Sequence, residues 1–200
     1  RADGTFSHLL WPSERFTELA QHLLSDGLQV LVTGTTADAD LAGPVREVGG
    51  VVDLVGRTTL GQLAWILKEC DTLIANSTGP LHLAAAVGTK VIGIYPAAAG
   101  MSPVRYGPFG PGHKVFSPPA DICGESVCTL EKCPEFNCLS RITTAQVREV
   151  ALGMTAQSPH RSRRSEAGRN GSKENGKKIR SAGPKRSTSS SGSFRTSTSE

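Results

Sequence analysis

The stretch DTLIANSTGPLHLAAAVGTKVIGIYP, residues 71–96, determines the predicted fold of this chain. It holds two short apolar runs, at 72–75 and 90–95, whose length and composition are typical of buried strands. Between them, small and apolar residues predict a helix over 80–87. The polar cluster Asn-Ser-Thr-Gly-Pro at 76–80 therefore falls where a buried strand ends and a helix begins.

Strands and helices alternate along the rest of residues 1–156 in the same way. Further apolar strands are predicted at 28–33 and 51–55, each next to a segment with helical periodicity. Strands this apolar are buried on both faces, which requires a parallel sheet covered by helices. The predicted fold class is α/β, with a Rossmann-like parallel sheet and helices on both faces. Residues 97–113 are predicted to form a long surface loop that leads to a last strand at 113–117.

Capping residues mark the ends of the predicted helices. Ser13 is the expected N-cap of the first helix, and Gly27 is expected to end it. Two later helices begin with the spacing of a capping box, in the pairs Thr59 with Gln62 and Thr143 with Gln146. The helix over 59–70 is expected to pack Trp65 and to bury an apolar stripe. The members of that stripe are Leu60, Leu63, Ile66 and Leu67.

Charge is distributed unevenly along the chain. Residues 1–156 carry 11 Lys and Arg against 15 Asp and Glu, a net charge of −4. Residues 157–200 carry 11 against 3, a net charge of +8, and their only large apolar residues are Ile179 and Phe194. Such a segment buries too little apolar surface to offset its chain entropy. We therefore predict one folded domain at 1–156 and a disordered basic tail, rich in Ser, Arg and Lys, at 157–200.

The Arg and Lys clusters of the tail allow contact with nucleic acid or with an anionic membrane surface. A solvated extension is the favoured interpretation, and we expect no specific nucleic-acid binding. No apolar run reaches the roughly 20 residues of a membrane span, and no secretory signal pattern opens the chain. The expected location is the cytoplasm, with peripheral association at the inner face of the cytoplasmic membrane left open. The first residues lack a Met, so we expect an N-terminal truncation.

The polar cluster after the strand suits a phosphate group. In open α/β sheets, ligands bind at the carboxyl ends of the strands, where a helix N-terminus offers N–H groups and a positive dipole end. Gly79 lets a ligand approach the backbone, and Pro80 lacks only an N–H that has no helical partner. Ser77, Thr78 and His82 are predicted to donate to phosphate oxygens. The alternative is that Ser77 or Thr78 only caps the helix.

The sequence NSTGPLHLAAAVGTKVIGIYP, at 76–96, resembles the nucleotide-sugar motif of glycosyltransferase family 9, the ADP-heptose:lipopolysaccharide heptosyltransferases and their relatives. Two flanking segments resemble the same family: WPSERFTELAQHLLSDGLQVLVTG at 11–34 and LVGRTTLGQLAWILKECDTLIANSTG at 54–79. The closing pattern of cysteines and apolar residues is also similar. The resemblance covers about residues 10–152 and leaves out the tail.

The resemblance implies the C-terminal, donor-binding half of a GT-B glycosyltransferase, in which two Rossmann-like domains face a cleft. It also implies an inverting transfer of a hexosyl or heptosyl unit from a nucleotide-diphospho-sugar such as ADP-heptose. The acceptor would be a glycan or a lipid-linked sugar of lipopolysaccharide biosynthesis. The general base would lie in an acceptor domain that this chain lacks, so its catalytic residues are unknown. No metal or other cofactor is expected, because amides and hydroxyls can stabilise the leaving diphosphate.

The implied site residues fall into two groups. The donor and phosphate group is Asn76, Ser77, Thr78, Gly79, Pro80 and His82, and the nucleotide group is Asp38 and Gly34. Asp38 also has the alternative role of a helix N-cap. Two positions depart from the family pattern, because Ser77 stands where relatives often have Asp, and Leu9 stands where they commonly have Lys. These departures affect the identity of the sugar more than the donor-binding role.

Four cysteines, Cys123, Cys128, Cys133 and Cys138, recur at intervals of five residues. Zinc sites usually have closer pairs, and a bacterial cytosol disfavours structural disulfides, so the spacing specifies neither. Cys70 is expected to be a core thiol. Two other functions were weighed. One is a non-catalytic nucleotide-binding or interaction module with a basic tail, and the other is a nucleotide-sugar epimerase, for which no set of catalytic carboxylates and His is visible.

Overall fold

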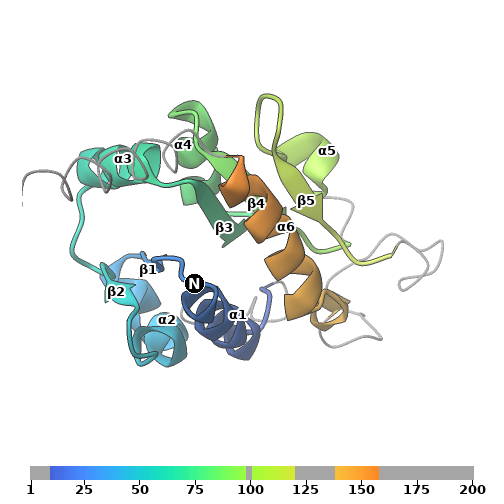
Figure 1. Cartoon of the computed structure of the whole chain (residues 1–200). Helices are drawn as coiled ribbons and strands as arrows, with labels where there is room; N and C mark the ends of the chain where they lie inside the picture. The colour runs from blue at the N-terminus through green and yellow to red at the C-terminus, as the bar shows by residue number, and fades with distance from the viewer. Residues whose placement is uncertain (1–9, 98–100, 120–137, 158–200) are drawn as a thin grey trace, which may run out of the picture.

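The computed structural model describes residues 10–97, 101–119 and 138–157, and Figure 1 shows how their helices and strands are arranged. The predicted tail and Cys123, Cys128 and Cys133 lie outside these residues. Within them, no helix is long and apolar enough to cross a membrane. Strands and helices alternate along the chain, as the sequence predicts, and every strand pairing is parallel. The α/β fold class is therefore confirmed.

The helices and strands have the following bounds. They are α1 (Ser13–Ser25), β1 (Leu31–Val32), the 3-10 helix η2 (Thr36–Asp38), α2 (Ala39–Arg46), β2 (Val52–Asp53), α3 (Leu60–Glu69), β3 (Thr72–Asn76), α4 (Gly79–Ala86), β4 (Lys90–Ile94), α5 (Pro103–Tyr106), β5 (Lys114–Phe116), the 3-10 helix η6 (Cys138–Arg141) and α6 (Thr144–Ala156). The short helix α5 lies inside the region for which the sequence predicts only a loop.

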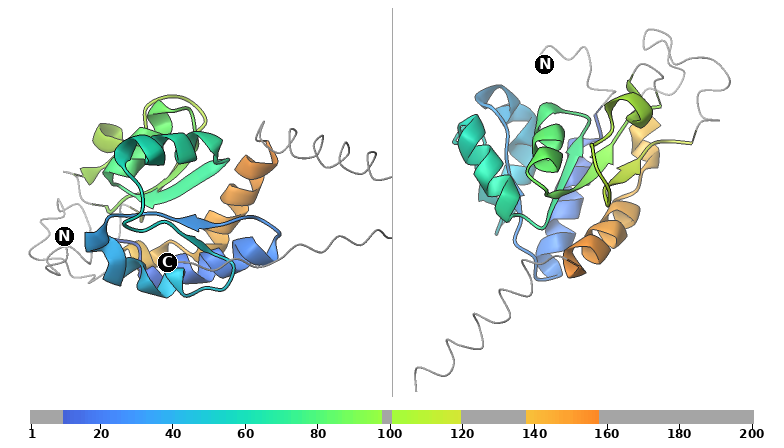
Figure 2. Two further views of the ribbon diagram at one scale, coloured as in Figure 1. Left: turned by 90° about the vertical axis from the view of Figure 1, so that its left-hand side faces the viewer. Right: turned by 90° about the horizontal axis from the view of Figure 1, so that it is seen from above.

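The strands are divided between two sheets, although the sequence predicts one. β1 pairs with β2, while β3, β4 and β5 form a second sheet in that order. Both strands of the first sheet are only two residues long. Leu28 and Val30, which precede β1, pack against the same hydrophobic core as Ile74 of β3. Side chains therefore join the two sheets where a backbone ladder was expected, and Figure 2 shows the sheets as separate ribbons.

Helices cover both faces of the β3–β4–β5 sheet, as predicted (Figure 2). Because side chains alternate along a strand, Ile92 and Ile94 of β4 enter one core with residues of α1 and α6. Val91 and Tyr95 enter a second core with residues of α3 and α4. Both cores contain fully buried residues. β4 is therefore the central strand of this sheet, and helices pack against both of its faces.

The predicted helix ends are largely confirmed. Both Thr–Gln capping boxes are present, at the starts of α3 and α6. Gly27 ends α1 with a φ of 78°, and the N–H of the following Leu28 donates to the carbonyl of Leu23 at 3.0 Å. Ser13 is not the N-cap of α1, because Pro12 holds that position and its carbonyl accepts from Arg15 at 3.0 Å. The fixed φ of proline suits the extended conformation that precedes a helix.

The predicted packing of α3 is only partly correct. Leu67 is buried, but Leu60 is 73% exposed and Trp65 is 67% exposed. Leu60 is the first residue of the helix, where the chain enters from the loop after β2 and has not yet reached the core. Cys70 is half-buried at the C-terminal end of the same helix rather than in the core.

Candidate functional site

The predicted donor-site residues lie at the carboxyl end of β3 and in the first turn of α4. Asn76 is the last residue of β3 and pairs with Ile94 of β4. Its side-chain oxygen accepts a hydrogen bond from the backbone N–H of Trp11 at 2.9 Å. Trp11 is buried, and its indole N–H donates to the carbonyl of Ile142 at 2.9 Å. Asn76 therefore ties the start of α1, and through Trp11 the start of α6, to the end of β3.

Ser77 continues the strand beyond Asn76, and its N–H donates to the carbonyl of Ile94 at 3.2 Å. Tyr95, the residue after Ile94, is fully buried, and its hydroxyl donates to the carbonyl of Tyr106 at 2.7 Å. Burial raises the pKa of the Tyr95 phenol, an effect that the Ser77 side chain partly opposes. Tyr95 therefore links the end of β4 to the end of α5.

The first turn of α4 is open to a ligand. Thr78 occupies the N-cap position, but its hydroxyl makes no capping bond and donates to the carbonyl of Asn76 at 3.2 Å. Thr78, Gly79 and His82 are exposed. A Cβ added at Gly79 would meet no atom within 4 Å. His82 lies one helical turn after Thr78. Because helical side chains lean toward the N-terminus of the helix, its ring can reach the space at the helix start.

Few backbone donors remain at this helix start. Pro80 has no N–H, and the N–H of Leu81 donates to the carbonyl of Thr78 at 3.1 Å. Among the described residues, no hydrogen bond uses the N–H groups of Thr78 and Gly79. These two amides and the His82 ring are therefore the donors that an anion could meet at the positive end of the helix dipole. The Thr78 hydroxyl joins them only when it turns away from the carbonyl of Asn76.

The predicted nucleotide residues, Gly34 and Asp38, are brought together after β1. A Cβ at Gly34 would lie 3.1 Å from the Cβ of Asp38. The Asp38 carboxylate accepts from both the N–H and the hydroxyl of Thr35, each at 2.7 Å, and so completes a capping box at η2. The Asp38 carboxylate is therefore the third residue of a box whose N-cap is Thr35. Asp38 also holds the N-cap position of α2, its alternative interpretation, but its side chain makes no capping bond there. This cluster follows a strand of the two-stranded sheet, whereas Asn76 ends β3 of the three-stranded sheet and Ser77 comes directly after it.

A second carboxylate, Asp53, lies at the end of β2 and is also paired. Its Oδ2 lies 2.8 Å from Arg46 and 3.5 Å from Arg57. The hydrogen bond from Arg46 and the bond from the N–H of Val55 hold the pKa of Asp53 below its usual value. Arg57, whose side chain is 65% exposed, is a cation at the carboxyl end of this strand that the sequence interpretation did not consider.

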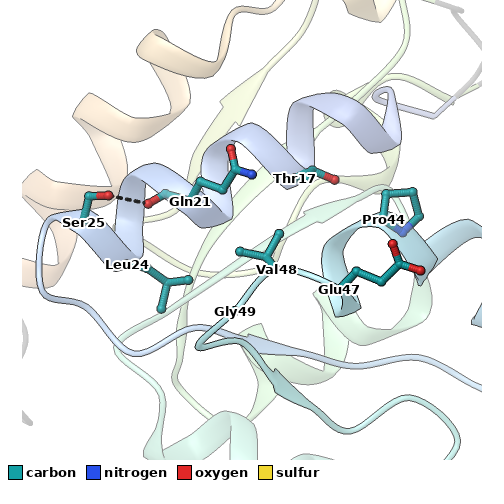
Figure 3. Close-up of a pocket in the computed structure, with 8 residues that line it drawn as sticks. All are labelled: Thr17, Gln21, Leu24, Ser25, Pro44, Glu47, Val48 and Gly49. Carbon is teal, nitrogen blue, oxygen red and sulfur yellow. Dashed lines mark hydrogen bonds between the residues drawn. The ribbon is translucent and has the colours of Figure 1, made fainter.

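An open groove between α1 and α2 is separate from both clusters. It is lined by Thr17, Gln21, Leu24, Ser25, Pro44, Glu47, Val48 and Gly49. Figure 3 shows the α1 residues facing the end of α2 across it, with the Ser25 hydroxyl turned back to the Gln21 carbonyl. Leu24 and Val48 also face each other in this view. The lining contains none of the predicted site residues.

The described residues contain no group of three or more His, Cys, Asp or Glu that could hold a metal ion. Cys138 is buried in the core between α1, β4 and α6. The other three cysteines of the series lie outside the described residues, so the role of the series as a whole stays open.

Comparison with known proteins establishes the family. The family model described as "Glycosyltransferase family 9 (heptosyltransferase)" matches residues 4–133, which is more than half of the chain. The chain therefore belongs to glycosyltransferase family 9. It is also similar to "Lipopolysaccharide heptosyltransferase 2" of Escherichia coli (strain K12), with 25% identity over 115 residues. That match covers 54% of this chain and 29% of the relative, so the chain spans less than a third of this relative's length.

Solved structures support the fold. The crystal structure of a family 9 glycosyl transferase from Veillonella parvula matches with a TM-score of 0.64 and 24% identity. It covers 76% of this chain, which corresponds to 43% of the solved one. The structure titled "E. coli heptosyltransferase WaaC with ADP" matches with a TM-score of 0.56 and 20% identity, over 72% of this chain and 39% of that one. At these identities the likeness shows the fold alone.

Two residues at the site were missed by the sequence interpretation. Trp11 enters the sequence interpretation only as the first residue of the segment 11–34, and its bond to Asn76 joins residues 65 positions apart. Tyr95 was treated only as the end of a strand. Its position two residues after Gly93 is a readable signal, because an alternating pattern places both on one face of the strand, where the glycine leaves room for a ring.

Proposed function

We propose that this chain binds the nucleotide-diphospho-sugar donor of a heptosyltransferase-like enzyme at the first turn of α4. The diphosphate would rest on the N–H groups of Thr78 and Gly79, with the His82 ring as a side-chain donor. The Thr78 hydroxyl would be a second one, after turning from the carbonyl of Asn76 to the ligand. As the bond to the sugar breaks, negative charge grows on the leaving nucleoside diphosphate. Fixed N–H and O–H donors at the helix start would stabilise that charge.

The observation that carries this proposal is the uncapped start of α4. Thr78 holds the N-cap position without capping the helix, and the space above Gly79 is open. The start lies at the carboxyl end of parallel strands, where ligands bind in folds of this class. It also coincides with the motif by which the chain resembles its family. An open helix start at that point is the arrangement that an anionic ligand requires.

The proposal extends to the reaction of the whole enzyme. The donor would be ADP-heptose or a similar nucleotide sugar, and the acceptor a glycan or lipid-linked sugar of the lipopolysaccharide type. Transfer would proceed with inversion at the anomeric carbon, in the cytoplasm or at the inner face of the cytoplasmic membrane. The catalytic base is not assigned, since Asp38 and Asp53 are both engaged by partners within the fold.

Calorimetric titration of the chain with ADP, UDP and GDP tests the proposal. We expect at least one nucleoside diphosphate to bind at a single site, with ADP the tightest. The nucleoside without phosphates should bind far more weakly, because the proposed contacts are to the diphosphate. Adding EDTA should leave the affinity unchanged. Failure of all three diphosphates to bind, with the protein folded, would overturn the proposed function.

A further inference from the structure

The stretch from β3 to β5 differs in charge from the rest of residues 1–156. Residues 72–119 contain three Lys and Arg and no Asp or Glu, a net charge of +3. The remainder of residues 1–156 carries 8 Lys and Arg against 15 Asp and Glu, a net charge of −7. The three cations, Lys90, Arg105 and Lys114, are exposed. The region of α5, β5 and the start of β4 therefore attracts anions, although residues 1–156 as a whole carry a negative charge.

The same region exposes large apolar side chains. Val104 of α5 is 97% exposed, Phe109 in the following loop is 93% exposed, and Val115 of β5 is 40% exposed. Val115 pairs with Gly93 of β4, whose Cβ position lies 3.0 Å from Leu81 of α4. The Val115 side chain is therefore on the face of the sheet that α4 covers. Figure 1 shows α5 beside β5, at the opposite edge of the molecule from α3.

The loop that carries Phe109 is fixed to the start of β4. The His113 ring accepts from the N–H of Val91 at Nδ1, at 3.1 Å, which leaves Nε2 to donate to the carbonyl of Phe109 at 3.1 Å. The Lys90 ammonium donates to the carbonyl of Pro111 at 3.4 Å. Phe109 is therefore held in solvent by a loop that is itself anchored, and large apolar side chains exposed in this way mark an interaction surface.

We propose that Val104 and Phe109, with Arg105 and Lys114 beside them, bind an anionic lipid membrane; these four residues are called the α5–β5 surface. The apolar side chains would enter the boundary between headgroups and acyl chains, and the cations would pair with lipid phosphates. Arg105 lies over the ring of Tyr106, 5.4 Å from its centroid, and aromatic residues of this kind are enriched at membrane interfaces. This deepens the proposed function, on which it rests for a lipid-linked acceptor.

The charge of the α5–β5 surface favours a membrane over a second copy of the chain. A symmetric contact would place Arg105 and Lys114 of one copy near those of the other, with no carboxylate from residues 72–119 to neutralise them. Val104 and Phe109 are also each almost surrounded by solvent, whereas the centre of a protein interface is a closely packed patch. The inner leaflet of a membrane offers an apolar interior and anionic headgroups together.

The α5–β5 surface leaves the proposed donor site free. Lys114 is the first residue of β5, and the carbonyl of Phe109 is bonded to His113 just before that strand. Thr78 and Gly79 instead follow the carboxyl end of β3. Because parallel strands begin at one edge of a sheet and end at the other, membrane binding and ADP binding can be altered separately.

Co-sedimentation of the full chain with lipid vesicles tests the inference. Vesicles of phosphatidylethanolamine and phosphatidylglycerol supply the anionic surface, and vesicles of phosphatidylcholine the neutral one, which should bind more weakly. Phe109→Ser and Val104→Ser should each weaken binding to the anionic vesicles by about tenfold or more, because a large apolar side chain removed from water contributes that much. Arg105→Gln and Lys114→Gln should each weaken it by about fivefold at low salt. All four variants should keep their ADP affinity.

Two controls separate the α5–β5 surface from other contributions. Trp65→Ser removes a large exposed side chain of α3 and should bind vesicles like the original chain. The basic segment 157–200 is also attracted to anionic vesicles, but it is present in every variant and salt screens its attraction. The loss in Phe109→Ser should therefore persist at high salt, while the loss in Lys114→Gln should shrink.

Fluorescence locates the contact directly. In the Trp65→Phe background, Phe109→Trp should shift its emission to the blue on anionic vesicles and be quenched by brominated lipid. Trp11 is buried and supplies a constant background. A vesicle-bound protein whose emission is unchanged and unquenched would place the contact elsewhere and overturn the inference.

The remaining outcomes keep this inference apart from the proposed function. Equal vesicle binding by the original chain, Phe109→Ser and Val104→Ser overturns it, and so does a dimer in solution that Phe109→Ser dissociates. ADP binding without vesicle binding overturns this inference alone, while vesicle binding as expected without ADP binding overturns the proposed function alone. If Phe109→Ser does not fold, Val104→Ser, in a different element, still decides.

Discussion

The start of α4 differs from the starts of α3 and α6, although a threonine holds the N-cap position in all three helices. In α3 and α6 the threonine hydroxyl accepts from the N–H of a glutamine three residues later, and the glutamine side chain bonds back. In α4 the Thr78 hydroxyl turns away to the carbonyl of Asn76. Two helices thus satisfy two of their own N-terminal N–H groups with a capping box. Among the described residues, the third has no such box, and the N–H groups of Thr78 and Gly79 donate to no backbone carbonyl.

Adding a side chain in the first turn should give the largest difference between the uncapped start of α4 and the capped start of α3. Gly79→Val should weaken ADP binding by more than about a hundredfold, because it fills the space through which a ligand reaches the backbone. The protein itself should tolerate the change, since a Cβ there meets no atom within 4 Å. Isothermal titration beside a melting curve measures both effects.

Gly61→Val is the matched control for this change. Gly61 lies in the first turn of α3, and a Cβ there also meets nothing within 4 Å. We expect that variant to keep its ADP affinity. Equal losses at the two glycines would show that the difference between the helix starts has no bearing on the ligand.

The second prediction compares the removal of Thr78, at the start of α4, with the removal of Thr59, at the start of α3. Thr78→Ala should weaken ADP binding by roughly ten- to a hundredfold, the effect of a charge-assisted hydrogen bond worth about 1.5–3 kcal/mol. Its melting temperature should hardly change. Thr59→Ala should do the reverse and lower the free energy of unfolding by about 1 kcal/mol, because it removes a real cap. If Thr78→Ala instead lowered stability and left affinity intact, Thr78 would be a cap in solution.

A smaller effect is expected at the start of η2, which resembles α3 rather than α4. Asp38→Ala removes the carboxylate that bonds Thr35 and should lower the free energy of unfolding by about 0.5–1 kcal/mol. ADP affinity should change by less than about twofold, which is smaller than the effect of losing one hydrogen bond to the ligand. Asp38→Asn, which keeps one acceptor oxygen, should fall between the two proteins in stability. A large loss of ADP affinity would contradict this expectation and indicate that Asp38 contacts the nucleotide.

The sequence predicts these helix starts better than it predicts their surroundings. The Thr-x-x-Gln spacing indicated two capping boxes correctly, because a capping box depends only on residues three positions apart. The strand predicted at 72–75 and the helix predicted at 80–87 lie within one residue of β3 and α4 at each end, since apolar runs and small residues are local signals. The exposed residues Thr78, Gly79 and His82 lie at the strand-to-helix junction, where the pattern placed them.

Contacts between distant parts of the chain could not be predicted in this way. The bond between Trp11 and Asn76, and the packing of Tyr95 beneath α4, depend on how the strands are ordered in space. The division into two sheets depends on side chains between β1 and β3, which no local pattern reveals. Trp65 was expected to pack because it is large and apolar, but its exposure is set by where α3 lies on the sheet.

The smallest expected effect is on stability at acid pH, and it concerns the contacts between α1 and α6 rather than the start of α4. Arg148 of α6 pairs with Asp26 after α1, its Nε lying 2.8 Å from Oδ2, and the hydroxyl of Thr144 donates to Glu18 at 2.6 Å. The hydrogen bond from Arg148 lowers the pKa of Asp26, and the one from Thr144 lowers that of Glu18.

Because both pKa values are lowered by folding, the unfolded chain binds protons first as pH falls. The stabilisation is therefore complete above the ordinary carboxyl pKa values of 3.8 and 4.5, and it is lost as pH falls through the lowered ones. Arg148→Ala removes the main cause of the Asp26 shift, so its melting temperature should fall less between pH 6 and about pH 3. Thr78→Ala, which touches no carboxylate pair between α1 and α6, should keep the acid response of the original chain. Equal responses in all three proteins would mean that the pairs between α1 and α6 do not form in solution.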